Sequence, residues 1–318
     1  MKALVTGCAG FIGSTLSERL LDEGLEVIGI DSFTDYYSKD IKEYNLKNLI
    51  LNDKFTLISE NLVTCDLKKY LDVDYVFHQA GQPGVRGSWG YDFEEYIYNN
   101  ISATQKLLEA SKNFNIKKIV YASSSSVYGN TDTMPMKESQ ITKPYSPYGV
   151  TKLAAENLCD LYSKNYGLSV ISLRYFTVYG PRQRPEMAIS TFIRNILDDK
   201  QIYIYGDGNQ GRDFTYVDDI VDANIKAAYS DIKSDIFNVG SQSPIKLIDV
   251  VKIIEDITGK KANINYLDSE KGDVKDTYSD ISRIKRYLGY ECKFNLEKGI
   301  YEQIKYIKNY MNFSHVIR

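Results

Sequence analysis

A glycine-rich turn between a short apolar run and an amphipathic stretch constrains the fold of this chain most strongly. Residues 3–6 have the pattern of a buried strand, and Gly7, Gly10 and Gly13 follow it before a helical pattern that extends to about residue 23. The next apolar run, residues 27–30, ends on Asp31. A strand, a glycine turn, a helix and a second strand with an acid at its tip predict a βαβ unit that binds a dinucleotide.

The chemistry of the turn indicates which dinucleotide to expect. Glycines bring no Cβ atom where phosphate and backbone must approach, and the start of the helix offers free amides to a pyrophosphate. Asp31 is placed to accept hydrogen bonds from ribose hydroxyls and would repel a 2′-phosphate, so we expect NAD rather than NADP. The spacing is GxxGxxG rather than the GxGxxG of the Rossmann fingerprint, so a purely structural glycine turn is the alternative.

Strand-like and helix-like runs alternate through the first half of the chain. Strand patterns recur at residues 55–58, 75–78, 119–121 and 170–173, and helical patterns lie between them at residues 41–51, 92–113 and 148–166. This alternation predicts an α/β fold with a Rossmann-type, doubly wound parallel sheet.

The pattern changes near residue 181, where short strands and helices mix with loops. We expect strands at residues 202–205, 236–239 and 264–266, and helices at residues 189–197, 218–230, 246–258, 281–288 and 296–310. The predicted organisation is an NAD-binding domain over residues 1–180, to which some later segments return, and a smaller C-terminal α/β lobe over residues 181–318 that binds the substrate.

Composition excludes several other classes of protein. The 318 residues are 43% hydrophobic and 25% charged, which is typical of a soluble globular protein, and a net charge of −3 gives no basic surface for nucleic acid. Four scattered cysteines without a CxxC pair and two histidines do not form a zinc pattern, so we expect no metal. No apolar run approaches the roughly 20 residues of a membrane span, and no signal peptide precedes the first strand, so the cytoplasm is the expected location.

Tyr148 and Lys152 are the candidate catalytic pair. They are four residues apart, so both side chains leave the same face if the segment is helical. A phenol loses its proton near pH ~10, and a neighbouring ammonium lowers that pKa, so Tyr148 could take a proton from a sugar hydroxyl near neutral pH. Ser124, in the serine run of residues 123–126, could hold the same oxygen. Taken alone, such a pair is far more often just two exposed helix residues.

Together, these motifs resemble the extended short-chain dehydrogenases that act on nucleotide sugars. The resemblance is carried by Gly7-x-x-Gly10-Phe11-Ile12-Gly13, Asp31, residues 123–129, Tyr148-x-x-x-Lys152 and residues 173–176, in this order. It implies bound NAD, a UDP-sugar in the cleft, and a homodimer formed through the helices around residues 92–113 and 148–166. The expected cofactor-binding residues are Gly7, Gly10, Phe11, Ile12, Gly13, Asp31, Ser32, Asn61, Leu62, Gln79, Ala80, Gly81, Asn100, Ser123, Tyr148, Lys152, Tyr175 and Val178.

Local sequence differences indicate which members of this family the chain resembles most. The dehydratases carry an acidic pair at the positions of Ser125 and Ser126. The UDP-glucuronate decarboxylases carry a glutamate at the position of Ser126. UDP-galactose 4-epimerases usually carry an asparagine at the position of Thr177. Residues 177–188, with residues 83–90 and 206–214, look like the UDP-glucuronate 4-epimerases, in which the arginine matching Arg184 faces the C5 carboxylate. A guanidinium gains roughly 1.5–3 kcal/mol from such a charge-assisted bond, although Arg184 could instead bind the diphosphate or lie in solvent.

The resemblance also implies a set of substrate contacts. Arg212 would face the UDP phosphates, and Asp273 would face the uridine. The chain departs from the galactose-type epimerases at Glu270, three residues before Asp273, where those enzymes carry an arginine. The expected substrate-binding residues are Arg86, Ser124, Ser125, Ser126, Tyr148, Thr177, Arg184, Met187, Arg212 and Asp273.

The resulting hypothesis is an NAD-dependent 4-epimerisation of UDP-glucuronate to UDP-galacturonate through a 4-keto intermediate. Tyr148 would remove the O4 proton, Ser124 would hold the oxygen, and Lys152 would bond the nicotinamide ribose. Three alternatives stay open: a 4-epimerase of neutral UDP-hexoses or UDP-pentoses, a UDP-glucuronate decarboxylase, and a non-catalytic NAD-binding regulator.

Overall fold

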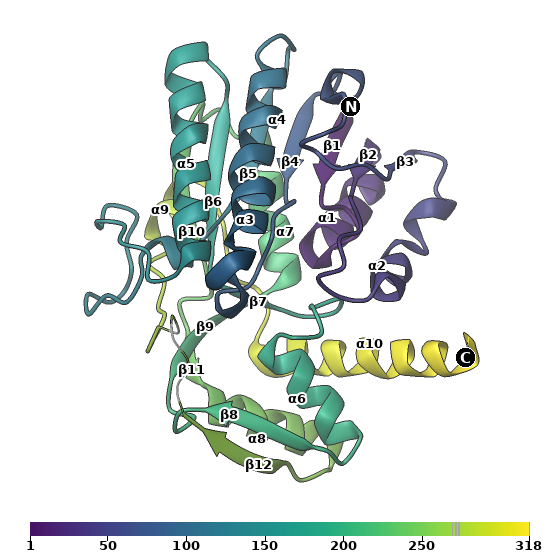
Figure 1. Cartoon of the computed structure of the whole chain (residues 1–318), viewed down its shortest axis with the longest axis vertical. Helices are drawn as coiled ribbons and strands as arrows, with labels where there is room; N and C mark the ends of the chain where they lie inside the picture. The colour runs from purple at the N-terminus through teal and green to yellow at the C-terminus, as the bar shows by residue number, and fades with distance from the viewer. Residues whose placement is uncertain (269, 271, 273, 318) are drawn as a thin grey trace.

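A seven-stranded parallel sheet forms the centre of the molecule (Figure 1). The computed structural model describes residues 1–268, 270, 272 and 274–317. The sheet has the strand order β10-β6-β5-β4-β1-β2-β3, and every neighbouring pair is parallel. The order reverses direction between β1 and β4, which creates the crevice where ligands bind in doubly wound sheets. The strands are β1 (Lys2–Thr6), β2 (Glu26–Ile30), β3 (Phe55–Ile58), β4 (Tyr75–His78), β5 (Lys118–Ser124), β6 (Val170–Tyr175) and β10 (Asp235–Val239).

Helices cover both faces of this sheet because successive strand residues point to opposite sides. Ala3 of β1 belongs to one buried cluster, with side chains of α1 (Phe11–Asp22) and α7 (Val217–Tyr229). Its neighbour Leu4 belongs to another, with side chains of α4 (Ala103–Ser111) and α5 (Pro147–Tyr166). The predicted α/β, doubly wound fold is therefore confirmed.

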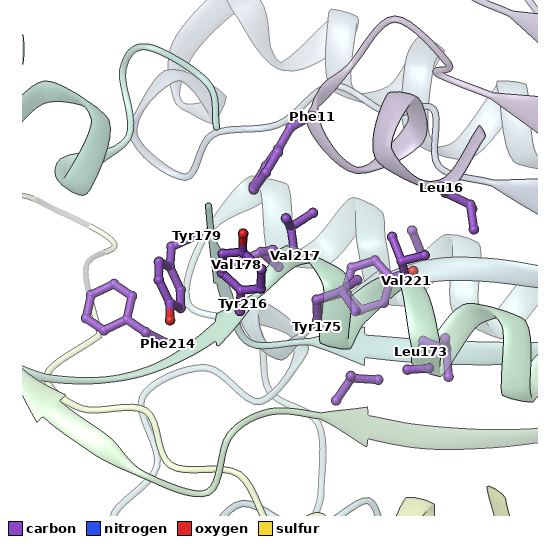
Figure 2. Packing of buried hydrophobic residues seen from close by; sticks show 14 of the residues in the cluster. Phe11, Leu16, Leu173, Tyr175, Val178, Tyr179, Phe214, Tyr216, Val217 and Val221 are labelled. Carbon is purple, nitrogen blue, oxygen red and sulfur yellow. The ribbon is translucent and has the colours of Figure 1, made fainter. Parts of the chain in front are cut away.

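A smaller lobe follows the carboxyl end of the sheet. A three-stranded sheet joins β7 (Thr177–Tyr179), β9 (Gly211–Tyr216) and β11 (Pro244–Lys246), while β8 (Gln201–Tyr205) pairs with β12 (Asn263–Leu267). Figure 2 shows how the two parts share one core: Phe11 points towards Val178, near Tyr179 and Tyr216. The lobe's helices are α6 (Ala188–Leu197), α8 (Leu247–Thr258) and α10 (Leu296–Ile317), and α9 (Ser282–Leu288) packs on β10.

Several elements differ from the sequence-based expectation. Residues 41–51 form α2 (Lys39–Leu46) and a separate 3-10 turn (Leu49–Leu51). Residues 92–113 form α3 (Phe93–Tyr96), a π-helical segment (Ile97–Ser102) and α4 rather than one helix. Strands β7, β9 and β11 were not predicted: β7 and β11 are short, and all three gain their partners from distant parts of the chain.

Residues 236–239 were predicted as a strand among the segments after residue 180. They form β10, which lies at the edge of the main sheet beside β6. The domain boundary at residue 180 stays a prediction. In the described part of the chain, no helix is both long enough and apolar enough to cross a membrane.

Candidate active site

The glycine turn packs closely against the ends of two strands. The Gly7 amide donates to the Ile30 carbonyl at 2.7 Å, and Gly7 has a φ of +70°, which favours glycine. A Cβ atom on Gly13 would lie 2.1 Å from the Gly7 carbonyl oxygen, so no larger residue fits there. Helix α1 begins directly after Gly10, and no side chain of the N-cap residue bonds its first amides.

Asp31 lies at the tip of β2 and is oriented by the backbone around it. Its Oδ2 accepts a hydrogen bond from the Ala9 amide at 3.0 Å, and its Oδ1 accepts one from the Phe33 amide at 2.8 Å. These bonds tie the carboxylate to the glycine turn and hold it at the edge of the cleft.

A cleft of about 940 Å³ runs along the turn and the ends of β1, β2 and β4. The tight turn, the helix start and Asp31 are the groups that a pyrophosphate and a ribose require. Thr34, Tyr36, Tyr37 and Lys42 also line the cleft; sequence reasoning missed them because no motif marks the loop after β2 or the first turn of α2. The predicted residues that line it are Gly7, Gly10, Phe11, Ile12, Gly13, Asp31, Ser32, Asn61, Leu62, Gln79, Ala80 and Gly81.

Four other predicted cofactor residues support the walls of the site. The Asn100 amide accepts from the Gln82 amide at 2.7 Å and donates to Thr151 Oγ1 at 2.9 Å. Ser123 donates to the buried Glu156 carboxylate at 2.6 Å, Tyr175 donates to Asn224 at 2.9 Å, and Val178 lies in the shared core. Direct contact between these four side chains and NAD stays a prediction.

Tyr148 and Lys152 lie in the first turns of α5, as the YxxxK spacing predicts. The helix begins there because Pro147 occupies its first position and the Ser146 hydroxyl accepts from the Gly149 amide at 3.1 Å. Ser124 ends β5 next to this turn, and its hydroxyl lies 3.1 Å from that of Ser126. The ring of Tyr148 packs edge-on against Tyr96, with ring centroids 6.3 Å apart.

The electrostatics of this pair differ from the sequence-based expectation. Burial raises the pKa of Tyr148, while a hydrogen bond with Ser124 and the positive charge of Arg184 partly oppose that effect. Burial also lowers the pKa of Lys152 to about 8, because desolvation disfavours its charged form. The prediction that Lys152 brings the Tyr148 pKa down is wrong for the protein chain alone, where Arg184 is the cation that acts on the phenol.

Two adjoining clefts receive seven of the ten predicted substrate residues, whereas Ser124 and Tyr148 are not among their lining residues. The larger, of about 1380 Å³, is lined by Arg86, Thr177, Arg184, Met187 and Arg212. The smaller, of about 620 Å³, is lined by Ser125, Ser126, Thr177 and Arg212. Thr177 and Arg212 line both, so the two clefts meet at these residues. Arg184 and Tyr36 line the larger cleft and the cofactor cleft together, at the junction of the two sites.

The arginines around these clefts have different partners. Arg184 Nε donates to Glu186 at 2.7 Å, whereas Arg182 pairs with Glu18 on α1 at 2.7 Å, away from the substrate clefts. Arg86 stacks its guanidinium over the Tyr205 ring, 3.9 Å from the centroid. Arg212 donates to the carbonyls of residues 211, 274 and 275, which sequence reasoning did not anticipate. Asp273, the predicted uridine contact, lies outside the described residues.

The described residues contain no group of three or more His, Cys, Asp or Glu side chains that could hold a metal ion.

Residues 3–240 match the model of the NAD dependent epimerase/dehydratase family, and the chain belongs to this family. The chain is 45% identical over 313 residues to the uncharacterized UDP-glucose epimerase YtcB of Bacillus subtilis (strain 168), covering 97% of this chain and 98% of that protein. It is 39% identical over 310 residues to the UDP-glucuronate 4-epimerase of Thermodesulfobacterium geofontis (strain OPF15), covering 96% and 95%.

A solved structure extends the comparison to three dimensions. The crystal structure of UDP-glucuronic acid 4-epimerase from Bacillus cereus, in complex with UDP-glucuronic acid and NAD, gives a TM-score of 0.95 at 44% identity. The match covers 98% of this chain and 100% of that one. The resemblance drawn from the sequence motifs is therefore confirmed at the level of family and fold.

Proposed function

We propose that this protein is an NAD-dependent UDP-glucuronate 4-epimerase, which interconverts UDP-glucuronate and UDP-galacturonate. The observation that carries the proposal is the position of Arg184, which lines both the cofactor cleft and the larger substrate cleft. Its charge also acts on the phenol of Tyr148, so a carboxylate bound to this guanidinium would lie near the catalytic base. The Bacillus cereus and Thermodesulfobacterium relatives are UDP-glucuronate 4-epimerases by name.

The chain's own groups would handle the proton of the reaction. NAD, when bound against the glycine turn and Asp31, supplies the acceptor and donor for the C4 hydride and a positive charge that favours the Tyr148 phenolate. Tyr148 takes the O4 proton as the hydroxyl becomes a ketone and returns it as the alcohol re-forms on the other face of the sugar. Ser124 holds the same oxygen, and Lys152 would bond the nicotinamide ribose. The reaction consumes no net proton.

The site must also prevent the 4-keto intermediate from losing its carboxylate as CO₂. A 4-keto uronate is a β-keto acid, which loses CO₂ readily when the bond to the carboxylate overlaps with the carbonyl. We assign Arg184, Ser125 and Ser126 to holding the carboxylate near the plane of the ring, where that overlap is poor. Ser126 stands at the position where the decarboxylases carry a glutamate, which favours epimerisation over decarboxylation.

A 4-epimerase of neutral UDP-sugars is the second candidate. It is favoured by the hydrogen bond between Arg184 and Glu186, because the carboxylate of Glu186 lines the same cleft and offsets part of the positive charge. The name of the Bacillus subtilis relative, a UDP-glucose epimerase, points the same way.

The experiment that separates these candidates compares kcat/KM for UDP-glucuronate, UDP-glucose and UDP-xylose in the wild-type protein and in Arg184→Ala. We expect the wild type to prefer the uronate, and the variant to lose roughly ten- to hundredfold of that preference, as the loss of a charge-assisted bond predicts. Arg182→Ala is the matched control, since Arg182 lies in the same loop but pairs with Glu18. A preference for neutral sugars, or an unchanged uronate preference in Arg184→Ala, would contradict the proposal.

We also propose that the protein is a homodimer. Apolar side chains stand in solvent along α5 and the π-helical segment before α4, among them Val150 and Leu161, which are 48% and 52% exposed, and Ile97 and Tyr98. Val150 and Leu161 are three helical turns apart and lie on one face of α5. A second copy of the chain packed against this face would bury them.

A further inference from the structure

Helix α10 connects the substrate lobe to the NAD-binding domain. In Figure 1 it runs from beside α6, in the lobe, to below α2. Gln303 anchors the helix in the lobe: its Oε1 accepts from the Gly180 amide at 2.9 Å, and its Nε2 donates to Gln183 Oε1 at 2.7 Å. The helix is therefore fixed to the loop that leads directly into Arg184.

Tyr306 lies one turn further along the same face of α10 and contacts the NAD-binding domain. Its hydroxyl donates to Asn45 Oδ1 on α2 at 2.7 Å. Burial raises the pKa of Tyr306, so the phenol keeps the proton that it donates. The rings of Tyr306, Tyr310 and Phe313 surround Tyr44, with centroids 5.7, 5.1 and 4.9 Å from that ring, and this packing holds α2 against α10.

Asn45 connects Tyr306 to the glycine turn. Its Nδ2 donates to the Ala9 carbonyl, in the middle of the glycine turn, at 3.0 Å. The amide of the same residue, Ala9, donates to Asp31 Oδ2 at 3.0 Å. Asn45 is 2% exposed, so both polar atoms of its amide depend on these protein partners. A continuous chain of hydrogen bonds thus runs from Tyr306 through Asn45 and Ala9 to the Asp31 carboxylate, which the proposed function places against the NAD ribose.

We propose that Tyr306 and Asn45 are positioning residues for NAD, which fix the glycine turn and Asp31 in the geometry that holds the cofactor. The substrate lobe thereby contributes to cofactor retention through a residue that does not itself line the cofactor cleft. The inference rests on the NAD site of the proposed function, but it does not depend on which sugar is the substrate.

The test measures cofactor binding rather than turnover. The dissociation constants of NAD and of UDP are determined by titration calorimetry for the full-length wild type, Tyr306→Phe and Asn45→Ala. We expect Tyr306→Phe to weaken NAD binding by roughly three- to tenfold, as the loss of one buried hydrogen bond predicts, and Asn45→Ala to weaken it by at least as much. UDP affinity should not change. Tyr301→Phe is the control, since Tyr301 is on the same helix but 54% exposed.

A double variant separates positioning from general destabilisation. If Tyr306 acts through Asn45, Tyr306→Phe combined with Asn45→Ala should bind NAD no more weakly than Asn45→Ala alone. Unchanged NAD affinity in folded Asn45→Ala would overturn the proposal, and so would parallel losses of NAD and UDP affinity. If the wild type binds NAD but does not turn over UDP-glucuronate, the proposed function is wrong, but the NAD affinities of the variants still test the roles of Tyr306 and Asn45.

Discussion

Arg184 and Glu186 form a hydrogen-bonded ion pair at the wall of the larger substrate cleft, with Arg184 Nε 2.7 Å from Glu186 Oε1. The glutamate orients the guanidinium and at the same time places a negative charge where a uronate carboxylate would bind. The selectivity of the cleft therefore depends on the pair and not on the arginine alone.

The first prediction concerns this pair. Glu186→Gln keeps a side-chain oxygen that can accept from Arg184 but removes the negative charge. We expect the KM for UDP-glucuronate to fall by roughly two- to fivefold, in keeping with the modest strength of a partly exposed ion pair, while the KM for UDP-glucose stays the same. Steady-state kinetics with both sugars checks this. A higher KM for the uronate would mean that the orienting role of Glu186 outweighs its charge.

The second prediction concerns the catalytic base. Tyr148→Phe removes the hydroxyl that takes the O4 proton but keeps the ring that packs against Tyr96. We expect kcat to fall by roughly 10²- to 10⁴-fold, the usual contribution of a general base, while calorimetry shows UDP-sugar affinity nearly intact. Tyr166→Phe, at the exposed end of α5, should leave both quantities unchanged. Full activity in Tyr148→Phe would remove this residue from the mechanism.

The third prediction concerns Lys152 and pH. Burial lowers the pKa of Lys152 from 10.5 to about 8, so between these values the unfolded chain holds a proton that the folded protein has lost. The cost of burying the charge is fully present below pH 8 and is relieved as the pH rises through this window. Lys152 should therefore make the free energy of unfolding increase with pH, by up to about 1.4 kcal/mol per pH unit.

Lys152→Met tests this linkage because it removes the titrating group and keeps an unbranched side chain. Urea denaturation of the wild type and the variant on either side of pH 8 measures the two slopes. The wild-type free energy of unfolding should rise more steeply, or fall less steeply, with pH than that of the variant. Identical slopes would show that Lys152 titrates in the folded protein as it does in the unfolded chain.

The fourth prediction concerns the exposed face of α5. Val150→Glu combined with Leu161→Glu places two charges on the surface that we assign to the homodimer. Light scattering after gel filtration should give a dimer mass for the wild type and a monomer mass for the variant. Leu51→Glu is the control, because Leu51 is also exposed but lies in the turn after α2. A monomeric wild type, or a variant that stays dimeric, contradicts the assignment of this face.

Sequence reasoning succeeded where local patterns determine the structure. The glycine turn and Asp31 occur within one βαβ unit, and β3 and β4 have the predicted bounds because their apolar runs are short and well delimited. The local sequence pattern did not predict the break between α3 and α4. There the π-helical segment carries Asn100, whose side chain bonds Gln82 and Thr151 from two other parts of the chain.

The electrostatics of the site also depended on the tertiary structure. The YxxxK spacing identified Tyr148 and Lys152 but gave the wrong sign for the Tyr148 pKa, since spacing does not report how deeply a phenol is buried. The partner of Arg184 is two residues away in the sequence, yet only the fold shows that both side chains turn into one cleft. The chain of contacts from Tyr306 to Ala9 joins residues that no sequence pattern relates.

The most direct test of the central claim follows the atoms of the substrate. The wild-type protein is incubated with NAD and UDP-glucuronate that carries deuterium at C4, and the products are identified by NMR. The account predicts UDP-galacturonate with deuterium retained at C4 and the carboxylate intact, because the same hydride leaves and returns within one active site. Release of CO₂ with a UDP-pentose, or recovery of unchanged UDP-glucuronate, would contradict it.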